Sequence, residues 1–296
     1  MVFLSNLING ISLGSVYAII ALGYTMVYGI AKMLNFAHGD VIMVGAYIAF
    51  MVMQGMTGVA APLCAVVASM CVCTLLGVVI ERLAYKPLRK AASLAVLITA
   101  IGMSYLLQNL AQLIWTANPK SFTSILAGAD SIRIGDGALI IRWETVVTVA
   151  ANIVIMAALT WFTSSTKTGR AMRAVSEDKG AAELMGINVN ATISLTFAIG
   201  SALAAVAGVL LCSTYPNLMP TTGSMPGIKA FTAAVFGGIG SVPGAMLGGV
   251  LLGIIEILGK AYISTELGDA LVFAVLIIVL LVKPTGLLGK QTREKV

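Results

Sequence analysis

The sequence predicts an all-α integral membrane protein, folded as a polytopic helical bundle with about 8–9 transmembrane segments. Hydrophobic residues make up 59% of the 296 positions and charged residues only 10%, and the mean hydropathy is +0.99. A water-soluble domain usually has about 25% charged residues. Uncharged runs such as 41–80 and 184–228 are long enough for one or two membrane-spanning helices each, since one crossing takes about 20 apolar residues.

Each candidate span is an apolar stretch bounded by charged or turn-forming residues. Residues 55–62 form a turn between the second and third spans, and residues 264–268 part the last two. Two alternatives remain open for residues 35–53: a full span, or a broken or re-entrant segment that lowers the span count and reverses the side of the N-terminus. The expected spans are residues 9–31, 38–56, 60–80, 93–115, 143–163, 191–212, 228–242, 244–263 and 267–283.

The basic residues set the expected orientation. Twelve of the 18 Lys and Arg residues fall in three regions, 82–90, 167–179 and 283–295. Cytoplasmic loops of membrane proteins carry an excess of Lys and Arg, so we place these regions, and with them the C-terminus, in the cytoplasm. The loops 116–142 and 213–226 are then external. Because loop topology accounts for the net charge of +6, we expect no nucleic-acid partner.

Glycines recur at positions that suit close helix packing and helix breaks. Gly10 and Gly14, like Gly249 and Gly253, are four residues apart and lie on one helical face, where small residues let backbones approach in lipid. Two glycine-containing breaks, 35–39 and 237–241, precede apolar helices about 200 residues apart. Paired interruptions in two halves of a transporter point to a central path. The candidate path residues are Asn35, His38, Gly39, Gly237, Gly238 and Ser241.

Polar residues within the spans have structural and functional interpretations. His38, with Asn35 and Asp40 nearby, is either a hydrogen-bonded structural residue or part of a half-helix whose positive end faces an amino-acid carboxylate. Glu256 is an acid deep in an apolar run, where a carboxylate is usually paired or functional. Lys260 is four residues further on, at the spacing of a helical ion pair.

No pattern in the sequence indicates an enzyme. The single His and the four Cys, all of them within apolar runs, form neither a nucleophile–base pair nor a metal-ligand set. We therefore expect no catalytic residue, no metal and no cofactor.

Residues 168–188 form a polar segment between two spans. Ser176 is a candidate N-cap and Gly186 a candidate C-terminal stop, which together predict a short amphipathic helix over residues 177–185. Such a helix has two interpretations: a docking element for a soluble partner, or a solvated helix at the membrane interface.

Further blocks of sequence stand out along the chain. They are residues 9–18 (NGISLGSVYA), 23–29 (GYTMVYG), 35–39 (NFAHG), 229–241 (KAFTAAVFGGIGS) and 284–289 (PTGLLG). These blocks resemble permeases of branched-chain amino-acid ABC importers, the LivH type, and the resemblance runs from end to end of the chain. The segment 168–188 is similar to the coupling loop of these permeases, in its acidic–small–small–glycine pattern.

The resemblance implies one transmembrane permease domain over residues 1–296, in a bacterial inner membrane, with a cytoplasmic coupling loop at 164–190. The implied partners are two ATP-binding subunits, a second related permease subunit, a periplasmic amino-acid-binding protein and membrane lipid. The chain has no phosphate-binding loop of its own, so ATP hydrolysis is expected in separate subunits. The implied residues for coupling to the ATPase are Glu177, Asp178, Ala181, Ala182 and Gly186.

Two rival functions are a secondary transporter and a passive channel with regulatory loops. A secondary transporter needs ion or proton ligands within the membrane, for which Asp40, His38 and Glu256 are the candidates. Uptake by this chain alone, without an ATPase, is the observation that would favour either rival over the ABC importer.

Overall fold

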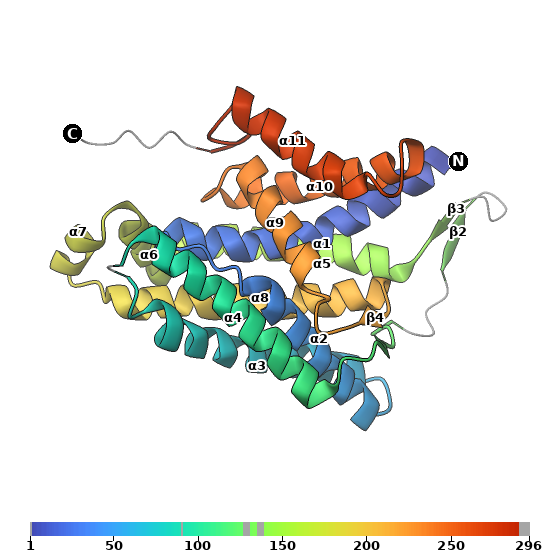
Figure 1. Cartoon of the computed structure of the whole chain (residues 1–296), viewed down its shortest axis with the longest axis horizontal. Helices are drawn as coiled ribbons and strands as arrows, with labels where there is room; N and C mark the ends of the chain where they lie inside the picture. The colour runs from blue at the N-terminus through green and yellow to red at the C-terminus, as the bar shows by residue number, and fades with distance from the viewer. Residues whose placement is uncertain (1, 90, 127–130, 135–138, 290–296) are drawn as a thin grey trace.

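Helices account for nearly all of the fold (Figure 1), and the computed structural model describes residues 2–89, 91–126, 131–134 and 139–289. Four residues of the expected cytoplasmic regions, Lys90, Lys290, Arg293 and Lys295, lie outside the described residues. The helices are α1 (Val2–Ala31), α2 (His38–Gly55), α3 (Ala61–Ile80), the π-helix η1 (Glu81–Tyr85), α4 (Ser93–Trp115), α5 (Trp143–Ser165), α6 (Lys167–Glu177), α7 (Lys179–Leu184), α8 (Val189–Thr214), α9 (Ser224–Gly237), α10 (Val242–Tyr262) and α11 (Gly268–Val282).

The short strands lie at one end of the bundle and α6 and α7 at the other (Figure 1). We call these the strand end and the α7 end. Strand β1 (Lys120–Ser121) pairs antiparallel with β4 (Asn217–Leu218), which joins the loop after α4 to the loop after α8. Strands β2 (Ile132–Ile134) and β3 (Leu139–Ile141) form a hairpin within the loop before α5.

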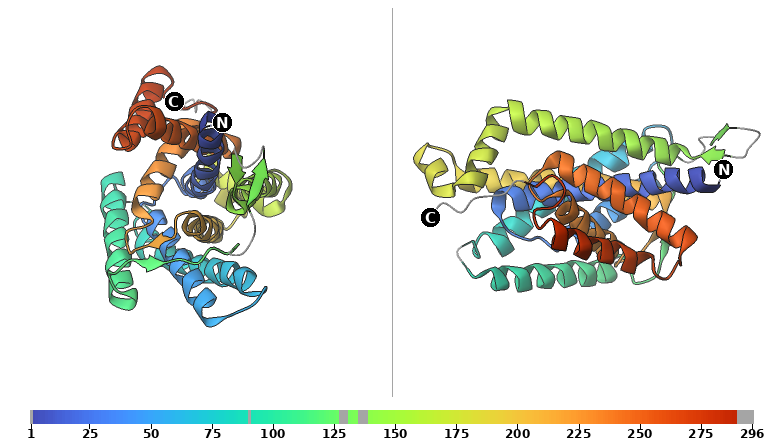
Figure 2. Two further views of the ribbon diagram at one scale, coloured as in Figure 1. Left: turned by 90° about the vertical axis from the view of Figure 1, so that its right-hand side faces the viewer. Right: turned by 90° about the horizontal axis from the view of Figure 1, so that it is seen from above.

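The long helix α1 forms the core of the bundle. It is buried at every residue from Ser12 to Val27 and packs against α5, α8, α9 and α10, and the end-on view in Figure 2 shows the long helices gathered side by side. A Cβ added at Gly253 of α10 would lie 2.2 Å from the backbone of Gly14, and one at Gly249 2.4 Å from that of Ala18. Backbone thus meets backbone along this crossing, which confirms the prediction that the glycine faces serve close packing.

The helices fall into two sets with matching contacts. Helix α1 packs on α10 as α8 packs on α3, and α2 packs against α8 as α9 packs against α1. The contacts of α4 with α2 repeat in those of α11 with α9. Each of these contacts of α1–α4 thus has a counterpart in which α8–α11 take the corresponding places, and this is the pattern of an inverted repeat.

Within each set the second helix begins inside the bundle. The chain leaves α1 at the α7 end, where Lys179 Nζ donates to the carbonyl of Ala31 at 3.0 Å. It then turns back, so that the His38 ring at the start of α2 lies against Tyr24, with ring centroids 4.6 Å apart. Tyr24 is seven residues before the end of α1, about 10 Å along the helix axis. From the opposite end, the loop after α8 leads in to the start of α9.

The two helix starts cross at three glycines. A Cβ on Gly223, just before α9, would lie 1.8 Å from the carbonyl oxygen of Gly39, and one on Gly227 would lie 2.8 Å from the Cα of Gly39. The break at residues 35–39 is therefore paired in space with the break at 219–223. The sequence pattern pairs it with residues 237–241 instead, and those residues form the tight turn between α9 and α10, with φ of +104° at Gly238 and +94° at Gly240. Positive φ of this kind makes a turn that glycine permits without strain.

Among the described residues, six helices are long and apolar enough to cross a membrane by themselves: α1, α3 with η1, α4, α5, α8 and α10. The about 8–9 expected spans exceed this number because α9 and α11 have only 14 and 15 residues, and because α2, with 18 residues, is made less apolar by His38, Asp40 and Gln54. At a rise of about 1.5 Å per residue, α9 and α11 cover less than the roughly 30 Å of a hydrocarbon core. Exposed apolar side chains on α3, α4, α5 and α11 form the outer surface. The protein is an all-α polytopic membrane protein.

Candidate functional site

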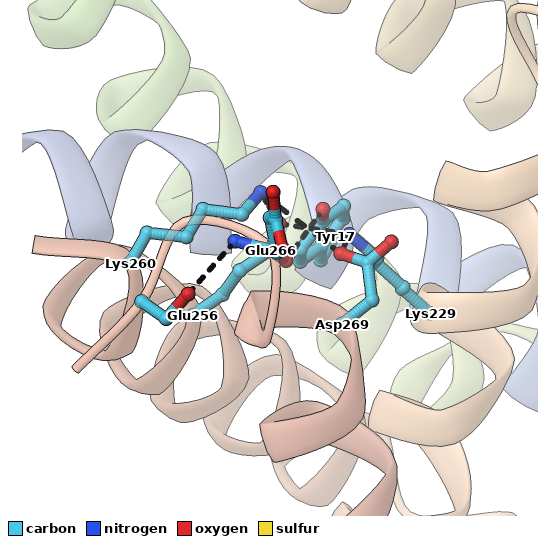
Figure 3. A network of polar contacts seen from close by, with 7 residues as sticks. Tyr17, Lys229, Glu256, Lys260, Glu266 and Asp269 are labelled. Atoms are coloured by element: carbon cyan, nitrogen blue, oxygen red, sulfur yellow. Dashed lines mark hydrogen bonds and ion pairs between the residues drawn. The ribbon is translucent and has the colours of Figure 1, made fainter.

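A cluster of four charged residues, of which Lys229 and Glu256 are buried, joins α9, α10 and α11 to α1 (Figure 3). Glu256 is 1% exposed, and its Oε1 accepts from Lys229 Nζ at 2.8 Å and from Lys260 Nζ at 2.5 Å. Its Oε2 accepts from the Tyr17 hydroxyl at 2.9 Å. Lys229 also donates to Asp269 at 2.6 Å. Two lysines and two acids leave no net charge, and every charge has a partner, as the buried Lys229 and Glu256 require.

A cavity of about 380 Å³ lies beside this cluster. Tyr17, Glu256 and Lys260 are among its polar residues, and Leu13, Leu211 and Ile257 are among its apolar residues. Tyr215 and Asn217, after the end of α8, place it toward the strand end. Binding cavities for small molecules have about 300–1,000 Å³ and combine an apolar lining with a few polar groups, and this cavity has that character.

Most of the polar residues in and after the break at residues 35–39 lie near the crossing of α2 and α9. Asn35 Oδ1 accepts from the Tyr85 hydroxyl at 2.8 Å. Asp40 Oδ1 accepts from Gln108 Nε2 at 2.9 Å, and that amide also donates to Ser224 at 3.2 Å. His38 is 1% exposed, and its Nε2 has no hydrogen-bond partner among the residues that the structure describes.

The predicted path residues form two separate groups. Asn35, His38 and Gly39 lie at the start of α2, against the start of α9. Gly237 and Gly238 lie at the other end of α9, where the carbonyl of Gly237 accepts from Leu288 N at 2.9 Å. Ser241 is the N-cap of α10 and accepts from Gly244 N at 3.2 Å. The 14 residues of α9 separate the two groups, about 21 Å along the axis.

The segment after α5 contains two short helices rather than the single helix expected over 177–185. Helix α6 ends at Glu177, and α7 begins at Lys179 with Asp178 as its N-cap, whose Oδ1 accepts from Ala181 N at 3.0 Å. The prediction that Ser176 is an N-cap is wrong, because its hydroxyl donates to the carbonyl of Arg173 within α6. A carboxylate accepts from free helix N–H groups at least as well as a hydroxyl.

Gly186 ends α7 as predicted. It has φ of +81°, its N–H donates to the carbonyl of Glu183, and the N–H of Ile187 donates to that of Ala182, both at 3.0 Å. These two bonds form a Schellman motif. Ala182 is buried, whereas the apolar side chains of Leu184 and Met185 are 90% and 82% exposed. The segment is thus a fixed projection from the α7 end with an apolar tip (Figure 1).

Comparison with known proteins identifies the family of this chain. Residues 6–280 match the family described as "Branched-chain amino acid transport system / permease component". The chain belongs to this permease family. It is 47% identical to the high-affinity branched-chain amino acid transport system permease protein LivH of Escherichia coli K12, over 99% of this chain and 98% of that protein. It is 46% identical, over the same shares, to the corresponding protein BraD of Pseudomonas aeruginosa.

More distant members of the permease family also match most of the chain. A probable branched-chain amino acid transport permease protein LivH from Methanocaldococcus jannaschii is 29% identical over 93% of this chain and 89% of that protein. These relatives are transport permease components and not enzymes, and together with the apolar helices they show that this chain is a multi-pass membrane protein.

The sequence predicts two of the four charged residues of the cluster as partners. The ion pair of Glu256 with Lys260 is confirmed. The sequence does not predict Lys229 and Asp269 as partners in the cluster. One signal is present, because Lys229 is a single charge between the apolar runs 184–228 and 230–255. A lysine in that setting needs an acid from another helix.

Proposed function

We propose that this chain is the transmembrane permease subunit of an ATP-driven ABC importer that carries branched-chain, aliphatic amino acids across the bacterial inner membrane. The observation that supports it most is the end-to-end identity of 47% to the E. coli permease LivH. The cavity beside Glu256, with its apolar and charged walls, suits a zwitterion with an aliphatic side chain. The proposed partners are two ATP-binding subunits, a second related permease and a periplasmic amino-acid-binding protein.

The proposed orientation places the α7 end in the cytoplasm and the strand end outside. The α7 end carries the basic segments 82–89 and 167–179 (Figure 1), and such loops favour the cytoplasm. Residues 283–289 belong to the same end, because Leu287 N donates to the carbonyl of Phe236 beside the α9–α10 turn. We propose nine crossings, in which residues 32–37, 215–223 and 263–267 complete the crossings of α2, α9 and α11. The N-terminus is then outside and the C-terminus cytoplasmic.

Uptake into proteoliposomes tests the proposed function. We expect radiolabelled leucine to accumulate only when the permease pair, the ATP-binding subunits, the binding protein and ATP are all present. Accumulation by this chain alone, driven by an ion gradient, would instead identify a secondary transporter, and equilibration without any energy source would identify a channel. The neutral, fully paired cluster around Glu256 speaks against a free ion ligand at that position.

We further propose that α7 couples the bundle to the ATP-binding subunits, with Glu177, Asp178, Ala181, Ala182 and Gly186 as its functional residues. Asp178 and Gly186 fix the two ends of α7. Lys179 connects α7 to the end of α1 through the carbonyl of Ala31. Force applied to the tip formed by Leu184 and Met185 therefore reaches the helix at the core of the bundle directly.

Substitution of the exposed tip tests this coupling. Leu184→Asp and Met185→Asp should each weaken co-purification of the ATP-binding subunits by roughly 10–100-fold, because burying one such side chain contributes about 1.5–3 kcal/mol. Both side chains are exposed in this chain, so its own folding should not change. Glu183→Gln, on the same turn, is the matched control and should bind normally. Normal co-purification and leucine-stimulated ATP turnover in both aspartate variants would refute the docking role.

Charge reversal at Glu177 and Asp178, or Gly186→Leu, should leave the complex assembled but uncouple ATP hydrolysis from leucine uptake. The leucine at position 186 must adopt φ near +81°, a left-handed conformation that costs roughly 1–2 kcal/mol for a residue with a Cβ. The measurement is the ratio of leucine transported to ATP hydrolysed. An unchanged ratio would contradict the proposed role of these residues.

A further inference from the structure

A second cavity, of about 260 Å³, lies at the α7 end among three cations. Lys32 follows α1, Arg89 follows η1, and Lys179 is the first residue of α7, and all three line the cavity. We propose that this cavity binds the phosphate group of an anionic phospholipid from the leaflet at the α7 end. The charge cluster at Glu256 is neutral by itself, whereas this cavity has more positive than negative charge.

Positive charge exceeds negative charge around the cavity. Arg89 is paired with Glu81, but within the described ranges neither Lys32 nor Lys179 has an acidic partner. The Nε of Arg89 is buried without a hydrogen-bond acceptor among those residues. Burial lowers the pKa of Lys179 below its usual value, and the charges of Arg89 and Lys32 lower it further. Two lysines without an acidic partner, next to a guanidinium whose one acidic partner is Glu81, leave an excess of positive charge that suits an anion.

The start of α4 adds to this attraction. Ser93 and Val96, in the first turn of α4, line the same cavity. The helix has 23 residues, and its N-cap, Ala92, has no side chain that accepts a hydrogen bond from the free N–H groups. The N-terminus of a long helix has a partial positive charge and stabilises phosphate groups. The cationic side chains and the N-terminus of α4 thus both attract an anion.

The remaining walls of the cavity favour a lipid as the source of the phosphate. Leu34, Leu88 and Leu97 are part of the lining, and Leu97 belongs to α4, where the nearby Leu94 and Ile98 are 65% and 61% exposed. A headgroup in the cavity would leave its acyl chains along this apolar face. Basic cavities between helices at the cytoplasmic surface are typical sites for anionic headgroups. A free phosphate ion would gain nothing from the apolar wall.

Lipid titration of the full-length chain tests the proposal. The delipidated protein in detergent is titrated with phosphatidylglycerol, with phosphatidylcholine, and with phosphatidylglycerol in the presence of inorganic phosphate, and native mass spectrometry counts the lipids retained. We expect one phosphatidylglycerol to be retained in preference to phosphatidylcholine. Lys32→Gln and Lys179→Gln should each weaken its retention about fivefold. Lys86→Gln is the matched control, because Lys86 is exposed at the same end but does not line the cavity.

Three outcomes would overturn the proposal. Equal retention of the two lipids, which both carry a phosphate, would show that the cavity does not select a headgroup with net negative charge. An equal loss in Lys86→Gln would show that retention reflects only the general positive charge of this end. Displacement by millimolar inorganic phosphate would identify a free anion as the ligand. The name of the leaflet rests on the proposed orientation, but retention in detergent does not, so a failed topology and a failed site are distinguishable.

Discussion

Replacing Glu256 with alanine should destabilise the folded protein by about 3–5 kcal/mol, the cost of leaving a buried charge without its partner. The carboxylate accepts from Lys229, Lys260 and Tyr17 at once. Without it, two lysines share Asp269 as the remaining acid of the cluster, and Tyr17 loses its acceptor. Lys260 is partly exposed and can turn outward, but Lys229 has a side-chain exposure of only 6%. The expected result is a large fall in thermal midpoint and in the yield of monodisperse protein.

The neighbouring acid Glu266 provides the matched control. It is exposed in the α10–α11 loop, so Glu266→Ala should change the midpoint little. The double substitution Lys229→Met with Glu256→Met removes one charge of each sign and leaves Lys260 opposite Asp269. Apolar residues of similar volume often replace a buried ion pair without loss, so the double variant should be more stable than either single one. A midpoint for Glu256→Ala equal to that of the control would disprove the structural importance of the cluster.

The cluster also shows what the sequence can predict and what it cannot. The pair of Glu256 and Lys260 is local, since four residues bring two side chains to one helical face. The contacts of Lys229 with Glu256 and Asp269 join three helices across 27 and 40 positions. No periodicity within one helix encodes which helices become neighbours, and so these partners emerge only from the assembled bundle.

Helix positions follow from the apolar runs because the bilayer imposes them, and the expected starts of α2, α4 and α5 agree with the structure to the residue. The geometry of helix breaks does not follow in the same way. Glycine marks a break both where the backbone needs positive φ, as at Gly238, and where another backbone approaches, as at Gly223. The sequence does not distinguish these two uses of glycine, so its pattern pairs residues 35–39 with 237–241 and not with 219–223.

The second large effect is expected at Gly223, where α2 and α9 cross. An alanine Cβ there would overlap the carbonyl oxygen of Gly39 at 1.8 Å and its carbonyl carbon at 2.7 Å. Both obstructing atoms are backbone, so no rotamer change relieves the clash and the helices must separate. Overpacking a core typically costs about 1–3 kcal/mol and occasionally more, and a rigid obstruction belongs at the upper end. We expect Gly223→Ala to lower the thermal midpoint and to abolish leucine uptake in proteoliposomes.

A graded series separates this crossing from a general effect of removing glycine. At Gly227 a Cβ would meet the Cα of Gly39 at 2.8 Å, a smaller overlap, whereas at Gly102 on the outer face of α4 it would meet nothing within 4 Å. Gly102→Ala should therefore be neutral or stabilising by up to about 1 kcal/mol, since alanine favours a helix over glycine. The expected order of loss is Gly223, then Gly227, with Gly102 unaffected. Equal losses at all three positions would mean that the packing of α2 against α9 does not depend on close backbone contact.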